Sequence, residues 1–346
     1  MICLLACFVV TLRLTAQNPL SEPLADIPPT DDPDGISPTH VYAKAELLNR
    51  SLDRLIESWN EQKLGATIVR SPELPHEVEK DLQPMHVYQT MLTCTWRLQQ
   101  LDDHDDLNVR HIPTMSSQPR EYRPRDVFFL VTMMLENVQQ IAKKLKIEDM
   151  PSEQKPESDK TATDVYFQAV KAFMKLNALN EHETIEASEV YSQMVRAAED
   201  ARSILRQYDP ACRYRIDRIE NTEERKPADV FGKCLEIRQL IKQHFEFLKD
   251  RLDETQAKEL KVTPIPDMPT QTINPRDVFF QTQIIIAELN LLKMALGTKS
   301  STPLAIEVGD ETKPTHVYQQ GLLVEYLVRQ IQSGANLPLT PAVESE

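Results

Sequence analysis

The sequence predicts an all-α protein of eight amphipathic helices, built as a tandem duplication of a four-helix unit with long, ordered, extended connections. Three observations predict this fold. A short signature, Pro-x-(Asp/His)-Val-(Tyr/Phe), occurs eight times with small variations. Apolar residues then continue from each copy in steps of four and three. Finally, the chain of 346 residues contains only seven glycines, a low share that favours helix-rich structure.

The signature is regular enough to mark each helix start. Every copy keeps the valine and the aromatic residue after it, while two copies have Ala162 or Ala187 in place of proline. The pairs are Val41 and Tyr42, Val87 and Tyr88, Val127 and Phe128, Val165 and Tyr166, Val190 and Tyr191, Val230 and Phe231, Val278 and Phe279, and Val317 and Tyr318. The residue before the valine is an acid in Asp126, Asp164, Glu189, Asp229 and Asp277, and a histidine in His40, His86 and His316.

Each part of the signature has a role at a helix start. Proline suits the first helical position, where its missing N–H would have no partner in the helix. An acid at the third position can accept the N–H of the cap residue and meets the positive end of the helix dipole. An apolar residue precedes the cap in five copies, at spacing that predicts a hydrophobic staple with the valine: Ile36, Leu82, Tyr122, Ile185 and Ile273.

The steps of four and three predict helices that pack nearly parallel or antiparallel, as in bundles. The third helix shows the pattern well, with Val127, Val131, Met134, Val138, Ile141 and Leu145. Most connections between helices are long enough to run back along a whole helix, at about 3.3 Å per residue. The sequence therefore leaves the relative direction of most neighbouring helices open. The short connection between Leu179 and Glu186 predicts that the fourth and fifth helices are antiparallel or join end to end.

Along the chain we expect a signal peptide at 1–16, an extended lead-in at 17–36, four-helix units at 37–181 and 182–332, and a disordered tail at 333–346. Before the third helix the chain reads LNVRHIPTM, and before the seventh it reads LKVTPIPDM; both lead into PRDVFF. This match indicates an internal duplication.

Apolar residues inside the long connections suggest that these segments pack on the helices as ordered straps. These residues are Ile68, Val69, Val109, Ile112, Val262, Ile265, Leu304, Ile306 and Val308.

The net charge of −14 argues against a nucleic-acid partner, because phosphate binding needs an excess of Lys and Arg on one face. The apolar N-terminus is too short to span a bilayer and is typical of a signal peptide, with cleavage after Ala16. We therefore expect a periplasmic or secreted protein without a membrane-spanning segment in its mature form. Apolar residues directly after Cys7 disfavour a lipoprotein. A cytoplasmic protein with a mis-assigned start is the alternative.

No residue is predicted to be catalytic, to bind a cofactor or to bind a metal. His40, His86 and His316 could bind a metal if helix starts converged, but they are better explained as substitutes in the capping position. The acidic run LDDHDD at 101–106 lacks the spacing of a calcium loop. Cys94 and Cys234 lie on helix seams and are expected to be buried, whereas Cys212 lies in a connection and lacks an activating neighbour.

The eight signature aromatics could line a ligand cavity, but their recurrence favours a structural role, with each tyrosine hydroxyl bonded to nearby backbone. The sequence thus predicts a non-catalytic, exported helical-repeat binding or scaffold protein, whose partner is another protein of the cell envelope. One alternative is a small molecule held in a bundle core, where Ala45, Ala169, Ala172 and Gly321 could leave room. An enzyme of unknown class is the third hypothesis.

Overall fold

Each of the eight signatures begins a helix. The computed structural model describes residues 35–62, 68, 80–105, 118–154, 158–180, 184–208, 223–250, 263–306, 308–309 and 311–334. These residues contain eight α-helices and no strand: α1 (Pro38–Gln62), α2 (Pro84–Asp105), α3 (Pro124–Lys144), α4 (Ala162–Leu179), α5 (Ala187–Tyr208), α6 (Pro227–Lys249), α8 (Pro275–Ala295) and α9 (Pro314–Gly334). The predicted all-α class is confirmed.

In every one of these helices the third residue accepts a hydrogen bond from the cap residue. In α3, α4, α5, α6 and α8 its carboxylate accepts the N–H of the cap residue, at 2.8–3.0 Å. In α1, α2 and α9 the Nδ1 atom of a histidine accepts the same N–H, at 3.1–3.2 Å. The prediction that histidine substitutes for the acid in the capping position is therefore confirmed.

The apolar part of the signature is buried. All eight signature valines are at most 2% exposed, and the five apolar residues that precede the caps are at most 8% exposed. Each helix therefore starts with a polar cap and a buried apolar contact.

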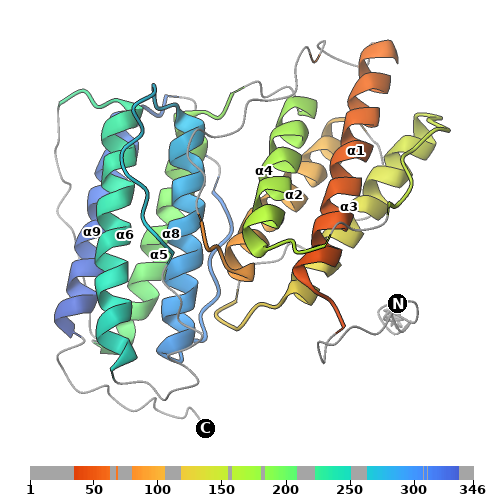
Figure 1. Ribbon diagram of the computed structural model, residues 1–346. Helices are drawn as coiled ribbons and strands as arrows, with labels where there is room; N and C mark the ends of the chain where they lie inside the picture. Colours follow the sequence, from red (N-terminus) through yellow and green to blue (C-terminus); the bar gives the residue numbers. More distant parts are fainter. Residues whose placement is uncertain are drawn as a thin grey trace, which may run out of the picture. The chain divides into compact units, whose positions relative to one another are not determined.

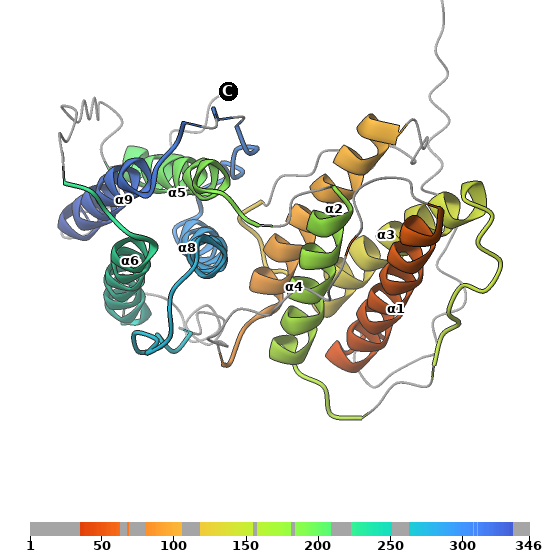
Figure 2. The ribbon, with the colours of Figure 1, turned by 90° about the horizontal axis from the view of Figure 1, so that it is seen from above.

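The helices form two groups of four with the same pattern of neighbours (Figures 1 and 2). In the first group, α1 and α2 each pack against α3 and α4. In the second, α5 and α6 each pack against α8 and α9. The shared pattern is consistent with the predicted duplication, which no comparison tests and which stays a prediction.

Within each group the helix starts lie together at one end, so the four helices run parallel (Figure 1). In the second group, the first residue and the valine of all four signatures line one narrow gap: Ala187, Val190, Pro227, Val230, Pro275, Val278, Pro314 and Val317. In the first, the Leu82 N–H donates to Thr163 Oγ1 at 3.1 Å. The Arg225 N–H makes the equivalent bond to Thr315 Oγ1 in the second, at 3.0 Å.

Parallel neighbours explain the lengths of the connections. The chain must return along a whole helix between successive helices of one group, and it has 63–83, 106–123 and 145–161 for this in the first group. Only the connection 180–186, which joins the two groups, is short. The structure thus shows that the helices within each group run parallel, a direction that the sequence left open.

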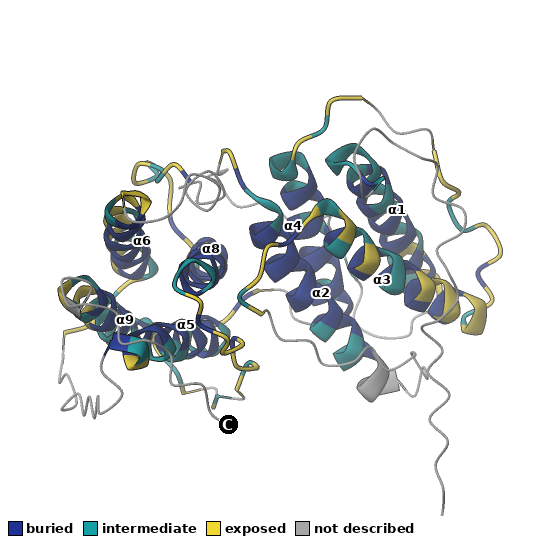
Figure 3. Cartoon of the chain, turned by 90° about the horizontal axis from the view of Figure 1, so that it is seen from below, coloured by how far each residue is buried: buried dark blue, intermediate teal, exposed yellow. Residues whose placement is uncertain are grey.

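The helix α8 is the most enclosed element, and it contacts α5, α6 and α2. Every residue from Asp277 to Lys293 is buried, as the dark blue of α8 shows (Figure 3). By length and composition alone α8 could cross a membrane, but 89% of its most apolar stretch is buried inside the fold, which is equally typical of a core helix. The absence of a membrane-spanning segment stays a prediction.

Direct contacts also join the two groups. The ring of Phe173 on α4 stacks on that of Phe279 with centroids 5.2 Å apart, and meets the Phe280 ring edge-on at 5.7 Å. Residues 36–346 accordingly form one compact unit. The division at 181 into two domains stays a prediction. The predicted signal peptide at 1–16 lies outside the described residues, as do residues 17–34 of the predicted lead-in at 17–36 and most of the predicted tail.

The expectation that apolar connection residues pack on the helices is wrong for two of them. Leu304 is 50% exposed and Ile306 is 48% exposed. Their connection is nevertheless fixed by its backbone, because the Ile306 N–H donates to Ser192 Oγ at 3.0 Å. Val69, Val109, Ile112 and Val262 lie outside the described residues.

We predict that Val127→Ala and Val278→Ala each lower the free energy of unfolding by about 1–3 kcal/mol, because each opens a cavity beside a helix start. Urea unfolding followed by circular dichroism measures the effect. Ile306→Ala, at a half-exposed position, is the control and should change the free energy by less than about 0.5 kcal/mol. Equal losses at all three positions would contradict the buried role of the valines.

Candidate functional site

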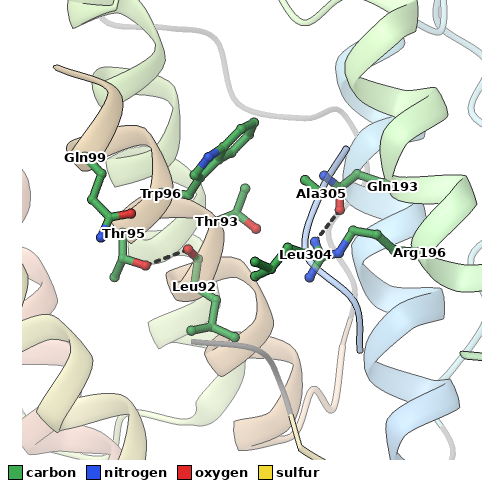
Figure 4. Close-up of a pocket in the computed structure, with 9 residues that line it drawn as sticks. All are labelled: Leu92, Thr93, Thr95, Trp96, Gln99, Gln193, Arg196, Leu304 and Ala305. Carbon is green, nitrogen blue, oxygen red and sulfur yellow. Dashed lines mark hydrogen bonds between the residues drawn. The ribbon is translucent and has the colours of Figure 1, made fainter. Parts of the chain in front are cut away.

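A pocket of about 130 Å³ lies between α2, α5 and the connection that precedes α9. Its lining combines apolar, amide and guanidinium groups (Figure 4). The residues are Leu92, Thr93, Thr95, Trp96 and Gln99 from α2, Gln193 and Arg196 from α5, and Leu304 and Ala305 from the connection. The half-buried Trp96 and the half-exposed Leu304 are the large apolar side chains that solvent reaches here.

Among the described residues of this lining, Arg196 is the charged one. It is 7% exposed, and its guanidinium points toward Leu304 and α2 (Figure 4). Its Nε donates to the carbonyl oxygen of Pro303 at 2.9 Å, and its Nη1 donates to Gln193 Oε1 at 2.6 Å. These two bonds fix the guanidinium plane, while its Nη2 has no hydrogen-bond partner among the described residues.

A chain of amides holds Gln193, the partner of Arg196. The Gln89 side chain on α2 donates to Gln283 Oε1 on α8 at 2.9 Å, and Gln283 Nε2 donates to Gln193 Oε1 at 2.7 Å. Gln193 Oε1 therefore accepts from both Gln283 and Arg196. Because all three amides are buried, the chain couples the two walls of the pocket through the core helix α8.

A buried polar cluster fixes the connection that closes the pocket. Thr302 donates its hydroxyl to Asp200 Oδ2 at 2.8 Å and accepts from Asn290 Nδ2 at 2.6 Å. Lys293 pairs with Asp200 and donates to the carbonyl oxygen of Ser300 at 3.0 Å. Burial raises the pKa of the Asp200 carboxyl, against the opposing effect of Lys293. The connection is thereby tied to both α5 and α8.

Arg196 has no carboxylate partner of its own among the described residues. Asp200 acts on Arg196 electrostatically, but it already pairs with Lys293. Burial lowers the pKa of Arg196 to about 10, so it stays a cation at neutral pH. By contrast, the nearby Arg97 pairs with Glu189, the capping acid of α5. The pocket thus contains one buried positive charge that pairs with no carboxylate of the described residues.

The structure does not bring the other sequence candidates together into a site. His40, His86 and His316 serve as caps at three different helix starts, and within the described residues no cluster of His, Cys, Asp or Glu could hold a metal ion. Cys94 and Cys234 are buried as predicted, and burial raises the pKa of both thiols. Cys212 and the side chains of the acidic run at 102–106 lie outside the described part.

The signature aromatics lie elsewhere in the fold. Tyr88, Tyr166, Phe231 and Phe279 are buried, and none of the eight aromatics lines the pocket. The ring of Tyr42 lies 4.6 Å from Lys160 Nζ, and that of Tyr318 lies 4.6 Å from the Arg225 guanidinium. The Tyr42 hydroxyl accepts from the Gln168 side chain at 3.0 Å, whereas the sequence predicted a backbone partner.

Sequence reasoning missed the residues that line the pocket. Arg196 directly precedes Ala197, which lies on the apolar seam of α5. This position next to the seam was the feature of the sequence that could have indicated its burial. Trp96, one of two tryptophans in the chain, lies between Thr95 and Arg97 without a recognisable motif. The pocket exists only because helices from both groups meet.

Comparisons with models of known protein families, with curated proteins and with solved structures find no match to this chain. The pocket geometry is therefore the basis on which function can be argued.

We predict that the stability of the protein falls as the pH is lowered from about 6.5 toward 3, in part through His86. Burial, aided by Arg238, lowers the pKa of His86 from 6.5 to about 3. The unfolded state therefore binds this proton first, so the stability is present above pH 6.5 and is lost as the pH falls toward the folded pKa.

Urea unfolding of the wild type and of His86→Asn at pH 7 and pH 5 checks this prediction. The side-chain oxygen of asparagine can accept a hydrogen bond but takes up no proton at these pH values, so His86→Asn should lose less stability between the two pH values. His316→Asn, at another capping histidine, is the matched control. An equal pH dependence of His86→Asn and wild type would contradict the assigned role.

Proposed function

We propose that this chain is a non-catalytic binding protein that uses the pocket between α2 and α5 to hold one side chain of a partner protein. The observation that carries the proposal is the pocket itself, which measures about 130 Å³ and is lined by Trp96, Leu304 and Arg196. Two hydrogen bonds hold the guanidinium of Arg196 in place. Tryptophan and arginine are enriched among the residues that dominate protein–protein binding.

The pocket volume favours a side chain over a whole ligand. Pockets for drug-sized molecules measure roughly 300–1,000 Å³, whereas an apolar cavity of about 150 Å³ accommodates benzene. At about 130 Å³, this pocket suits a single side chain. The exposed Leu304 and Ile306 next to it would add contact area for the rest of the partner segment.

The alternative of a small molecule in a bundle core has less support. The gap between the four helix starts of the second group measures about 10 Å³, about the minimum for one water. Ala45, Ala169 and Ala172 are fully buried. A Cβ at Gly321 would lie 3.1 Å from Lys233 Cγ, so this glycine permits close helix packing.

We predict that Trp96→Ala and Leu304→Ala reduce the recovery of a partner several-fold, because both remove apolar contacts at the pocket. The measurement is affinity capture from the source cells with the full chain, after chemical cross-linking, quantified by mass spectrometry. Tyr326→Ala removes a partly exposed aromatic residue of α9 that does not line the pocket, so it should keep the partner. Equal recovery with all variants would overturn the proposed site.

We also propose export, because the first sixteen residues have the apolar character of a signal peptide. The mature protein should then begin at Gln17 and occur outside the cytoplasm. Fractionation followed by mass spectrometry of the N-terminal peptide checks this. A chain that retains Met1 and is found in the cytoplasm would contradict export.

A further inference from the structure

We propose that the pocket between α2 and α5 is a carboxylate site, in which Arg196 binds an acidic side chain of the partner while Trp96 and Leu304 cover its apolar stem. This inference rests on the proposed function for the source of the carboxylate. The binding chemistry itself comes from the pocket alone.

The first argument is charge. A buried cation without a paired acid carries a large desolvation cost, which a bound anion would relieve. In the cluster around α5 and α8, Lys293 and Asp200 form a pair without net charge, whereas Arg196 has no acid paired with it among the described residues. Because Asp200 pairs with Lys293 and accepts a hydrogen bond from Thr302, the positive charge of Arg196 is left at the pocket.

The second argument is geometry. Arg196 Nε donates to Pro303 and one Nη1 hydrogen goes to Gln193, so both Nη2 hydrogens are donors left for a ligand. Its neighbours in the lining are neutral: threonine hydroxyls, amides and apolar groups. A monoanion balances the single charge of Arg196, whereas a phosphate dianion would leave a negative charge without a partner. A carboxylate therefore fits better than a phosphate.

The third argument concerns the rest of the partner. The chain as a whole carries a net charge of −14, so a generally acidic partner would be repelled over long range. The exposed Leu304 and Ile306 flank the pocket and offer apolar contact. We therefore infer that the occupant is a single Asp or Glu within an apolar, otherwise neutral or basic segment.

Saturation-transfer NMR with butyrate tests the carboxylate site on the full chain, and butyramide serves as the neutral probe of matched shape at the same ionic strength. We expect saturation transfer to butyrate and little to butyramide. Arg196→Gln should weaken butyrate binding roughly tenfold or more, since a hydrogen bond to a charged group is lost. Arg202→Gln, on the same helix but outside the pocket, should bind as wild type.

Circular dichroism checks that Arg196→Gln is folded, and Trp96→Ala provides a second variant that keeps the buried arginine. Trp96→Ala should weaken butyrate binding several-fold. Equal transfer to butyrate and butyramide would overturn the proposal, as would unchanged butyrate binding in folded Arg196→Gln or in Trp96→Ala.

Partner capture with Arg196→Gln separates this inference from the proposed function. If butyrate binds through Arg196 but no partner protein is recovered, the carboxylate site stands and the proposed function fails. If wild type and Arg196→Gln recover the same partner equally, the proposed function stands and the carboxylate site is wrong. A partner lost in Arg196→Gln and also lost when its acidic residue is changed to the amide would support both.

Discussion

The structure depends on the close approach of four helix starts at one end of each group. Every helix start carries about half a positive charge, so four parallel starts repel one another. The third residue of the signature offsets this repulsion, since Glu189, Asp229 and Asp277 place carboxylates at three of the four starts in the second group. In α1, α2 and α9 the Nδ1 atom of a histidine ring accepts the cap N–H instead.

This arrangement accounts for the long connections and, through them, for the pocket. Parallel helices need a return segment as long as a helix, and one such segment, before α9, runs along α5 and α8. Thr302, Asn290 and Asp200 hold it in place, while Pro303 accepts from Arg196. The candidate site thus follows from the parallel arrangement. The connection before α9 forms one wall of the pocket, and α2 and α5 form the others.

Local chemistry made the helices predictable from sequence. The signature sets the first turn of each helix by interactions within four residues, such as the bond between Thr161 and Asp164, so no distant part of the chain is needed. Burial of the valines follows from their place on the seam. The predicted burial of Cys94 and Cys234 is confirmed for the same reason.

Features that depend on distant contacts could not be predicted. Helix direction was open because the connections were long enough for either choice. The exposure of Leu304 and Ile306 could not be read from an extended segment that has no periodicity. The pocket joins Trp96 to Arg196, which lie a hundred positions apart in the sequence, and their proximity depends on how α2 meets the second group.

The parallel direction of the helices is tested most directly by distances between spin labels at their ends. Two pairs of cysteine substitutions suffice, at the exposed positions Lys226 and Lys313 (the caps of α6 and α9), and at Lys226 and Ser333 (the far end of α9). Cys3, Cys7 and Cys212 are changed to serine to avoid extra labelling. The account predicts a short distance for the first pair and one of about 30 Å, the length of a 21-residue helix, for the second. A long first distance with a short second distance would mean that α6 and α9 are antiparallel, and would contradict the account.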